Sequence, residues 1–252
     1  FIGLISFCSF LTLAQQKIIP GKNKNNYETN HTSQSIAECA KSTSNAELDI
    51  NNVRAMLWNG GDMWWDLTCC SSYEIPKNSG KNSLFAGALW IGGVTPGGQL
   101  LVAAQTYRQS NRNSYWPGPL DNSGSIDSSE CLAWDDHYKI TNKDSIYDFR
   151  YRYQQGLIST VNDIPDEILY WPSRNNPNFT DRNMNLNLAP FVDVNSDGNY
   201  NPLDGDYPEI MGDQSVWWVM NDAGGIKILD GTNAEPPIGL EVQVEAFAFC
   251  AY

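Results

Sequence analysis

The residue types and spacing that suit chemistry gather in one short stretch of this chain. Oxygen-bearing side chains recur at alternating positions from residue 193 onward, and Gly198 stands sixth, where a twelve-residue calcium loop makes its sharp turn. The six positions with ligand spacing are Asp193, Asn195, Asp197, Asn199, Asn201 and Asp204. Calcium is a hard cation that prefers oxygen ligands on a flexible loop. The spacing therefore predicts a Ca²⁺ site formed by these six residues.

Each position in the loop has an expected role. The first three ligands would supply side-chain oxygens, Asn199 would offer its backbone carbonyl, and Asn201 would bind directly or through water. The last position departs from the usual pattern, because Asp204 replaces the longer bidentate Glu; dockerin-type loops resemble it in this respect. Asp206 is expected as an additional or substitute ligand.

The competing interpretation of the loop needs no ion. Asn and Asp side chains accept hydrogen bonds from nearby backbone N–H groups, so the same residues can form a run of Asx turns. Four regularly spaced acidic or amide groups around a glycine favour calcium over turns alone. Long amphipathic helices do not flank the loop in the sequence, so we expect a structural site rather than a helix-loop-helix sensor.

Catalytic motifs are not evident in the sequence. The chain has two histidines, His31 and His137, and no Gly-x-Ser-x-Gly motif, which leaves nucleophilic hydrolysis unsupported. Asp135-Asp136-His137 could form a metal site or an acid and base pair, but a solvated turn is the favoured interpretation. Glycosidase chemistry needs two carboxylates at a defined separation, and 29 acidic residues offer too many chance pairs. We nominate no catalytic residue, and the sequence leans against an enzyme.

Two tryptophan pairs, Trp64-Trp65 and Trp217-Trp218, suggest a platform for carbohydrate, because aromatic faces stack on sugars. Adjacent residues of a strand point to opposite faces, so at most one member of each pair could join a flat platform. Packing in the core is therefore the favoured interpretation of both pairs.

The composition limits the partners of this protein. A formal net charge of −13 and an isoelectric point near 4.4 would repel nucleic acid and an anionic membrane surface. Cations are the more natural partners. A hydrophobic content of 41% over 252 residues is enough to build a core.

The sequence divides into three regions. Residues 1–14 form an uncharged apolar run that ends in a small residue, which is typical of a secretory signal peptide and is too short to span a bilayer. Residues 15–47 form a polar leader with few large apolar residues, expected to be partly disordered. Residues 48–252 form a β-rich domain. The apolar run at residues 1–14 lacks an initiator Met and basic residues, and the C-terminal end of the sequence stops in a strand-like run. We therefore expect a fragment truncated at both ends.

Five cysteines follow the predicted signal peptide, at Cys39, Cys69, Cys70, Cys131 and Cys250, and export would permit disulfides. One member of the adjacent pair is expected to bridge to Cys131 or Cys39, although spacing does not fix the connectivity. A disulfide within the adjacent pair is the less favoured alternative.

Strand-like segments dominate the remaining chain. They cover residues 48–58, 83–91, 99–107, 214–220 and 239–250, and the last alternates apolar and polar residues with period two. The second segment is apolar at both parities, which predicts a strand covered on both faces, and it forms a hairpin with the third. Brief helices are expected within 142–155 and 164–172. Together these elements predict an all-β, sandwich-like fold with a few short helices and long loops.

Several segments together resemble the N-terminal part of large exported proteins of Bacteroidetes, which commonly end in a type IX secretion sorting domain. The segments are residues 48–55, 59–66, 85–93, 131–135, the loop at 193–204, 212–222 and 238–244. The resemblance runs in order from about residue 48 to residue 252. It implies an extracellular or cell-surface destination, export through the periplasm and a longer parent chain. It implies little about activity.

Three functions fit these observations. The leading hypothesis is a secreted or cell-surface, calcium-stabilised β-rich region with a structural or adhesive role, whose partners are calcium, the export machinery and other surface proteins. The second is a module that binds or processes extracellular polysaccharide. The third is an accessory region of a larger hydrolase. Nucleic acid and a transmembrane segment are not expected.

Overall fold

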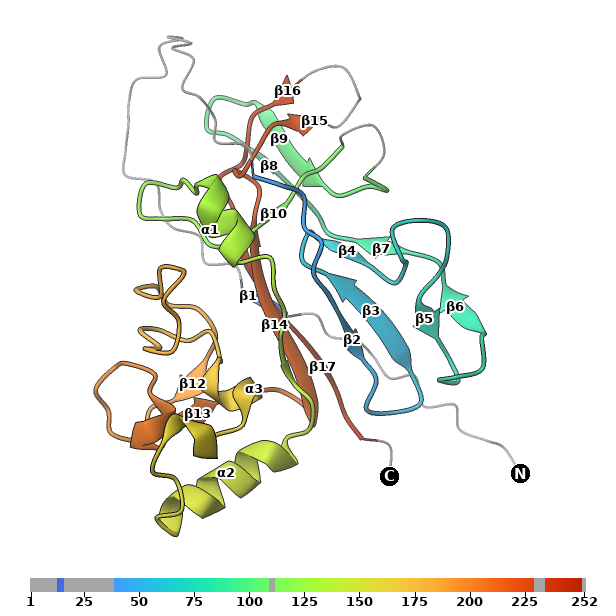
Figure 1. Cartoon of the computed structure of the whole chain (residues 1–252). Helices are drawn as coiled ribbons and strands as arrows, with labels where there is room; N and C mark the ends of the chain where they lie inside the picture. The colour runs from blue at the N-terminus through green and yellow to red at the C-terminus, as the bar shows by residue number, and fades with distance from the viewer. Residues whose placement is uncertain (1–12, 16–38, 109–111, 229–233, 251–252) are drawn as a thin grey trace.

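A computed structural model describes residues 13–15, 39–108, 112–228 and 234–250 of the chain. Across these ranges the protein folds mainly into antiparallel strands, and its α-helices are short (Figure 1). The prediction of an all-β fold with a few short helices is confirmed.

Two larger sheets carry the described fold. The five-stranded sheet contains β1 (Leu13–Gln15), β17 (Glu241–Ala248), β14 (Gln214–Asn221), β10 (Trp116–Pro117) and β11 (Tyr138–Ile140). The six-stranded sheet contains β6 (Asn82–Leu84), β5 (Tyr73–Glu74), β3 (Arg54–Trp58), β4 (Asp62–Met63), β7 (Gly87–Ala88) and β2 (Asn45–Leu48).

Smaller elements decorate these sheets. Two-stranded pairs join β8 (Trp90–Val94) to β9 (Leu100–Ala104), β12 (Phe191–Val192) to β13 (Tyr207–Pro208), and β15 (Lys227–Ile228) to β16 (Ala234–Glu235). The helical elements are α1 (Ser128–Ala133), α2 (Asp144–Gln154), the 3₁₀ turn η2 (Val161–Asp163), α3 (Asp166–Leu169) and the 3₁₀ turn η3 (Pro202–Asp204). Both predicted helices are therefore present, although the second is a single turn.

A hydrophobic core lies between the two larger sheets. Strands β2 and β3 contribute Leu48 and Leu57, and the facing side of β14 and β17 contributes Trp218, Val242 and Val244. All of these side chains are buried. Burying two apolar sheet faces against each other is the basis of a sandwich.

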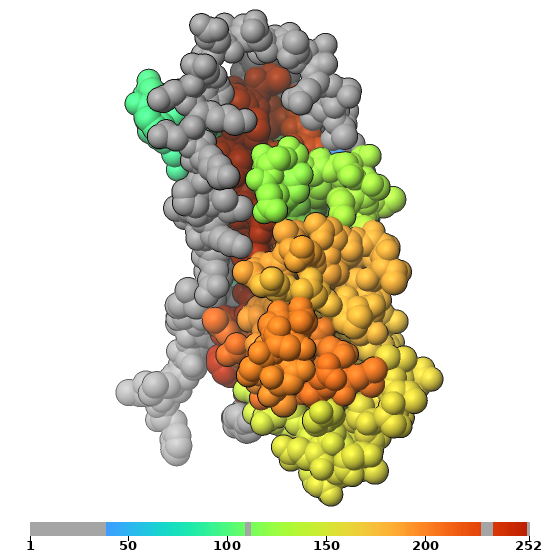
Figure 2. Space-filling view, turned by 90° about the vertical axis from the view of Figure 1, so that its left-hand side faces the viewer, coloured from blue at the N-terminus to red at the C-terminus, as the bar shows by residue number. Residues whose placement is uncertain are grey.

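A third layer covers the other face of the five-stranded sheet. Helices α2 and α3 and the long segments around them pack Phe149, Ile168 and Trp171 against Trp217 of β14. Figure 2 views this layer, coloured yellow-green to orange, from outside. Because both faces of β14 are covered, all eight of its residues are buried.

The central strands follow the predicted pattern. Strands β14 and β17 pair antiparallel, with Trp218 opposite Val244. Along β17, Val242, Val244 and Ala248 are buried, as its period-two alternation predicts. Trp217 and Trp218 enter different cores on opposite faces of β14, which confirms core packing for this pair. Trp65 is also buried.

Two predicted strands are wrong in detail. Residues 48–58 do not form one strand, because the chain turns between Leu48 and Arg54 and strand β2 pairs antiparallel with β3. Residues 83–91 are not covered on both faces: β6 is exposed and Trp90 in β8 is 70% exposed. The hairpin itself is confirmed, since β8 pairs with β9.

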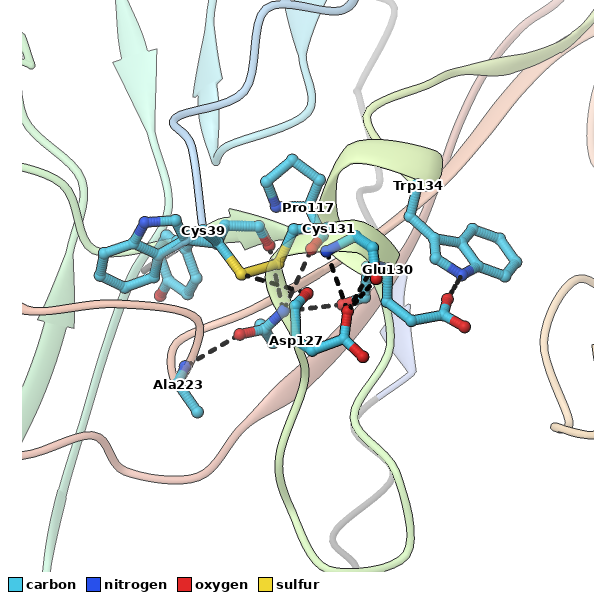
Figure 3. The surroundings of a disulfide bond; sticks show 12 residues. Cys39, Pro117, Asp127, Glu130, Cys131, Trp134 and Ala223 are labelled. Atoms are coloured by element: carbon cyan, nitrogen blue, oxygen red, sulfur yellow. Dashed lines mark hydrogen bonds between the residues drawn. A yellow bond between two sulfur atoms is a disulfide. The ribbon is translucent and has the colours of Figure 1, made fainter. Parts of the chain in front are cut away.

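The disulfide pairing also differs from the expected one. Cys39 bonds to Cys131, and the adjacent residues Cys69 and Cys70 bond to each other. Figure 3 shows the first bond joining the segment before β2 to α1, whose first N–H groups are capped by Asp127. The fold brings Cys39 and Cys131 together although they are 92 positions apart, so the spacing of the cysteines in the sequence could not predict this pairing.

The N-terminal regions are described in part. Most of the predicted signal peptide and leader lies outside the described residues, but Leu13–Gln15 form β1 at the edge of the larger sheet. Residues 39–47, expected within the leader, take part in the fold through Cys39 and β2. Among the described residues, we find no helix long and apolar enough to cross a membrane.

Candidate metal centre

The predicted calcium loop is the tip of a β-hairpin. Strand β12 pairs with β13, with Phe191 opposite Pro208 and Val192 opposite Tyr207. Residues 193–206 therefore connect two paired strands, and the two ends of this segment lie close together. The first and last predicted ligands thus belong to one closed loop. The hairpin belongs to the outer layer, beside α2 and α3 (Figure 1).

Two tyrosines fix the loop to this layer. Tyr200 is fully buried, and its hydroxyl donates to the backbone oxygen of Ile168 at 2.5 Å. Tyr153 of α2 donates its hydroxyl to the backbone oxygen of Asp204 at 2.9 Å. Its ring lies so close to Gly205 that a Cβ there would be 2.5 Å from the ring, and Gly205 has a φ of +95°. The base of the loop is therefore held from two sides.

The first half of the loop is a series of Asx turns. Asp193 accepts backbone N–H groups from Ser196 at 2.6 Å and from Gly198 at 2.8 Å. Asn195 accepts from the N–H of Asp197 at 3.0 Å. Ser196 and Gly198 have positive φ angles, which turn the chain around the Asp193 carboxylate. The first three predicted ligands thus lie on one tight turn.

In the second half of the loop, the side chains of Asn199 and Asn201 already make hydrogen bonds. The Asn201 side-chain oxygen caps η3 by accepting from the N–H of Leu203 at 3.2 Å, and its amide donates to Asp204 at 2.7 Å. The Asn199 side-chain oxygen accepts from the Asn175 amide at 2.6 Å, which leaves its backbone carbonyl for the role predicted from the sequence.

Asp206 is the buried carboxylate at the centre of the loop. It accepts from the N–H of Val194 at 2.8 Å and from the N–H of Asn201 at 2.9 Å, and it is fully buried. Burial raises the pKa of Asp206, and repulsion from the carboxylates of Asp193 and Asp197 raises it further. A cation held among these three acids would relieve that repulsion.

The donor set fits Ca²⁺ in its chemistry. It offers carboxylate, amide and backbone oxygens, the mixture that this ion binds. Among the described residues, the loop acids do not form a group of three with ligand oxygens all within 4.8 Å of one another. The loop as described is a series of Asx turns, and Asp193, Asn195 and Asp197 are the residues of this turn that would hold an ion.

A second cluster has metal-like composition but different chemistry. Asp66, Cys69 and Cys70 bring one ligand atom each within 4.8 Å of the others. The two sulfur atoms form a disulfide, so they are not thiolate ligands. Asp66 instead accepts the N–H groups of Thr68, Cys69 and Cys70, each at 2.9 Å. These contacts hold its pKa well below the usual range. The cluster is a capped turn.

The Asp135-Asp136-His137 segment is not the solvated turn that we expected. Asp135 accepts the N–H of Thr43 at 2.7 Å, and the Nδ1 atom of His137 lies 2.8 Å from the Ser44 hydroxyl oxygen. The His137 ring packs on Trp218 with centroids 5.2 Å apart. Burial lowers the pKa of His137 to about 3. Residues 135–137 therefore connect the chain before β2 to β11. The polar partners, Thr43 and Ser44, lie far away in the sequence, so spacing did not indicate them.

The fold and loop define a β-rich protein with a closed, oxygen-lined hairpin tip. Comparison of the chain with protein-family models, with curated proteins and with solved structures found no match.

Sequence reasoning found the predicted ligands but missed the residues that hold them. Two of these residues, Tyr153 and Asn175, lie outside the loop and donate hydrogen bonds to it. The third, Tyr200, belongs to the loop and donates to the layer beneath it. An aromatic residue inside a run of Asn and Asp, as at Tyr200, is the one signal in the sequence that could have indicated an anchor. The other two lie far along the chain, and only the fold brings them close.

Proposed function

We propose that this protein is a secreted or cell-surface, calcium-stabilised β-rich region with a structural or adhesive role. The observation that carries the proposal is the hairpin tip at residues 193–206. There, the charges of Asp193 and Asp197 raise the pKa of the buried Asp206. A structural cation at that point would hold the tip against the outer layer.

Several features support an extracellular destination. Two disulfides form among the described cysteines, and disulfides persist in oxidising compartments. Calcium is also plentiful outside the cytosol, and at extracellular concentrations it fills weak calcium sites. The signal-like segment at residues 1–14, the acidic balance and the resemblance to exported Bacteroidetes proteins point the same way. Export by the type IX route is part of this proposal.

Thermal unfolding with and without a chelator tests the calcium role. We expect EGTA to lower the melting temperature and added CaCl₂ to restore it. Calcium at about 100 times its dissociation constant stabilises by roughly 2.7 kcal/mol. For a chain of this size, that corresponds to a shift of roughly 5–11 °C. The variant D193N/D197N should lose the shift.

The matched control is D148N, which removes one exposed acid from α2 outside the loop. It should keep the full response to calcium. If wild type and D193N/D197N melt at the same temperature in EGTA and in calcium, the Asx turns alone account for the loop and the proposal fails.

Polysaccharide processing remains a second proposal, and a hydrolysis screen of polysaccharides addresses it. Turnover of any polysaccharide by the purified chain would contradict a purely structural or adhesive role.

A further inference from the structure

A cleft of about 350 Å³ lies on the six-stranded sheet and the adjoining hairpin, away from the calcium loop. Its wall combines a buried acid with three aromatic side chains. The small residues 86–88 also line the cleft and leave space between the larger side chains. The lining side chains include Asp62, Trp65, Trp90, Gln105 and Tyr107. The volume falls within the range of small-ligand sites, about 300–1,000 Å³.

The acid in this cleft has one unused oxygen. Asp62 is 1% exposed, and its Oδ2 accepts from Arg108 Nε at 2.5 Å and from the Gln105 amide at 3.2 Å. Its Oδ1 is buried yet meets no donor at hydrogen-bonding geometry among the described residues. Burial raises the pKa of Asp62 to about 6, with Arg108, Gln105 and Trp65 partly offsetting that effect. A buried polar atom without a partner is rare and costly, so it calls for an explanation.

The aromatic side chains present fixed faces to solvent. Trp90 is 70% exposed, but its indole N–H donates to the backbone oxygen of Gln105 at 2.8 Å, which sets the orientation of the ring. Tyr107 is 52% exposed and packs edge-on against Trp65 with centroids 5.2 Å apart. Phe85, also exposed, packs edge-on against Tyr107. Large aromatic surface held rigid and left in water is typical of a recognition surface.

The charges around Asp62 select the kind of ligand. The guanidinium of Arg108 is almost fully buried and pairs with Asp62, and its Nη1 donates to the backbone oxygen of Ser42 at 2.6 Å. A cationic ligand would add a second positive charge beside this buried guanidinium. An anionic ligand would meet the Asp62 carboxylate in a protein of net charge −13. An uncharged ligand that can donate a hydrogen bond avoids both costs.

We propose that the cleft binds an uncharged saccharide unit of an extracellular polysaccharide. One apolar face of the sugar ring stacks on Trp90, and one of its hydroxyls donates to Oδ1 of Asp62, which solvent does not reach in the free protein and which the bound sugar must expose by shifting the floor of the cleft. Tyr107 and Trp65 form the side wall. The cleft is open, so a sugar within a longer chain fits it as well as a chain end. The assignment covers binding without reaction, and it is independent of the calcium loop.

The sequence does not indicate this site, for a physical reason. Its two tryptophan pairs suggested a sugar platform elsewhere, and residues 83–91 were expected to be covered on both faces. Only the fold leaves Trp90 in solvent and brings it beside Asp62, which lies 28 positions earlier in the sequence.

Isothermal titration of the full chain with defined oligosaccharides tests the assignment. The neutral probes are the hexasaccharides of cellulose, xylan, mannan, amylose and chitin. The charged probes are oligogalacturonate and tetramethylammonium chloride. We expect at least one neutral probe to bind with a dissociation constant below about 1 mM, which corresponds to roughly −4 kcal/mol. Neither charged probe should compete with it.

Matched variants locate the binding. W90A should weaken the neutral probe at least tenfold, and W90F, which retains an aromatic face, should recover part of the loss. The control Y151A removes an exposed tyrosine of α2 and should bind as wild type does. D62N should also weaken binding, and W90A decides the result if D62N does not fold, because Trp90 is mostly exposed.

The proposal is overturned if no neutral probe binds, if tetramethylammonium or oligogalacturonate binds instead, or if W90A binds the neutral probe as tightly as Y151A. A failed calcium test leaves these titrations unaffected, since the two sites lie on different layers of the fold. The two proposals therefore fail separately.

Discussion

The bond between Cys39 and Cys131 should supply a large part of the stability of this fold. It joins residues 92 positions apart. In the chain-entropy model, the cross-link removes about 2.1 + 1.5R ln n cal/mol/K from the unfolded chain, which for this loop is about 4.6 kcal/mol at 25 °C. Domains are typically stable by about 5–15 kcal/mol, so losing that amount would leave this protein marginal.

The variant C39A/C131A tests this value by urea unfolding with linear extrapolation. Alanine is preferable to serine because both cysteines are buried and a hydroxyl would need a partner there. We expect a loss of about 4–5 kcal/mol, with a larger dependence on urea because the unfolded chain expands. Near-ultraviolet circular dichroism should show whether the folded state remains packed.

The control is C69A/C70A. Its disulfide joins adjacent, exposed residues, so it closes almost no loop and should cost less than about 1 kcal/mol. If C39A/C131A unfolds within about 1 kcal/mol of this control, then the bond does not restrain the unfolded chain as reasoned. The segment from Cys39 to β2 would then be held by its hydrogen bonds to Asp135 and its strand pairing.

Two further predictions follow from single residues. Because burial lowers the pKa of His137 to about 3, the unfolded chain binds a proton that the folded chain does not between about pH 6.5 and 3. The free energy of unfolding should therefore be highest above about pH 6.5 and fall with acid by up to roughly 1.4 kcal/mol per pH unit. In H137N, the urea midpoint should depend less on pH, and an equal dependence in both proteins would refute the assignment. G205A should destabilise by about 1–3 kcal/mol more than G124A, because both glycines have positive φ but only Gly205 lies against the Tyr153 ring. Equal losses in urea unfolding would show that the loop base is not held there.

Local patterns predicted the centre of this fold well. The alternation along β17 and the apolar run of β14 each follow from which faces are buried, and those faces are the ones that the structure covers. The adjacent pair Trp217-Trp218 was assigned to the core because neighbouring strand residues point to opposite faces, and it packs that way.

Tertiary placement explains the errors. Asn51 and Asn52 form a turn in a segment whose flanks look like one strand, and pairing of β2 with β3 decides where each begins. The apolar run that contains Trp90 is exposed because no described element covers it. Hydrophobicity alone does not show which apolar face will find a partner.

The candidate metal centre divides in the same way. The spacing of Asp193, Asn195 and Asp197 is a local property, so the sequence reveals it. The buried position of Asp206 depends on β12 pairing with β13 and on Tyr153 reaching the loop from α2. A cap such as that of Asn201 on η3 competes with its predicted role as a ligand, and spacing does not distinguish the two.

The most direct test of the calcium proposal is a calorimetric titration of the decalcified protein with CaCl₂. We expect one ion per chain with a dissociation constant in the range of extracellular calcium modules, about 0.1–1 mM, and we expect D193N/D197N to lose the binding and D148N to keep it. Binding that survives in D193N/D197N would place the ion elsewhere. No binding by the wild-type chain would leave residues 193–206 as a hairpin held by Asx turns, and would contradict the central claim.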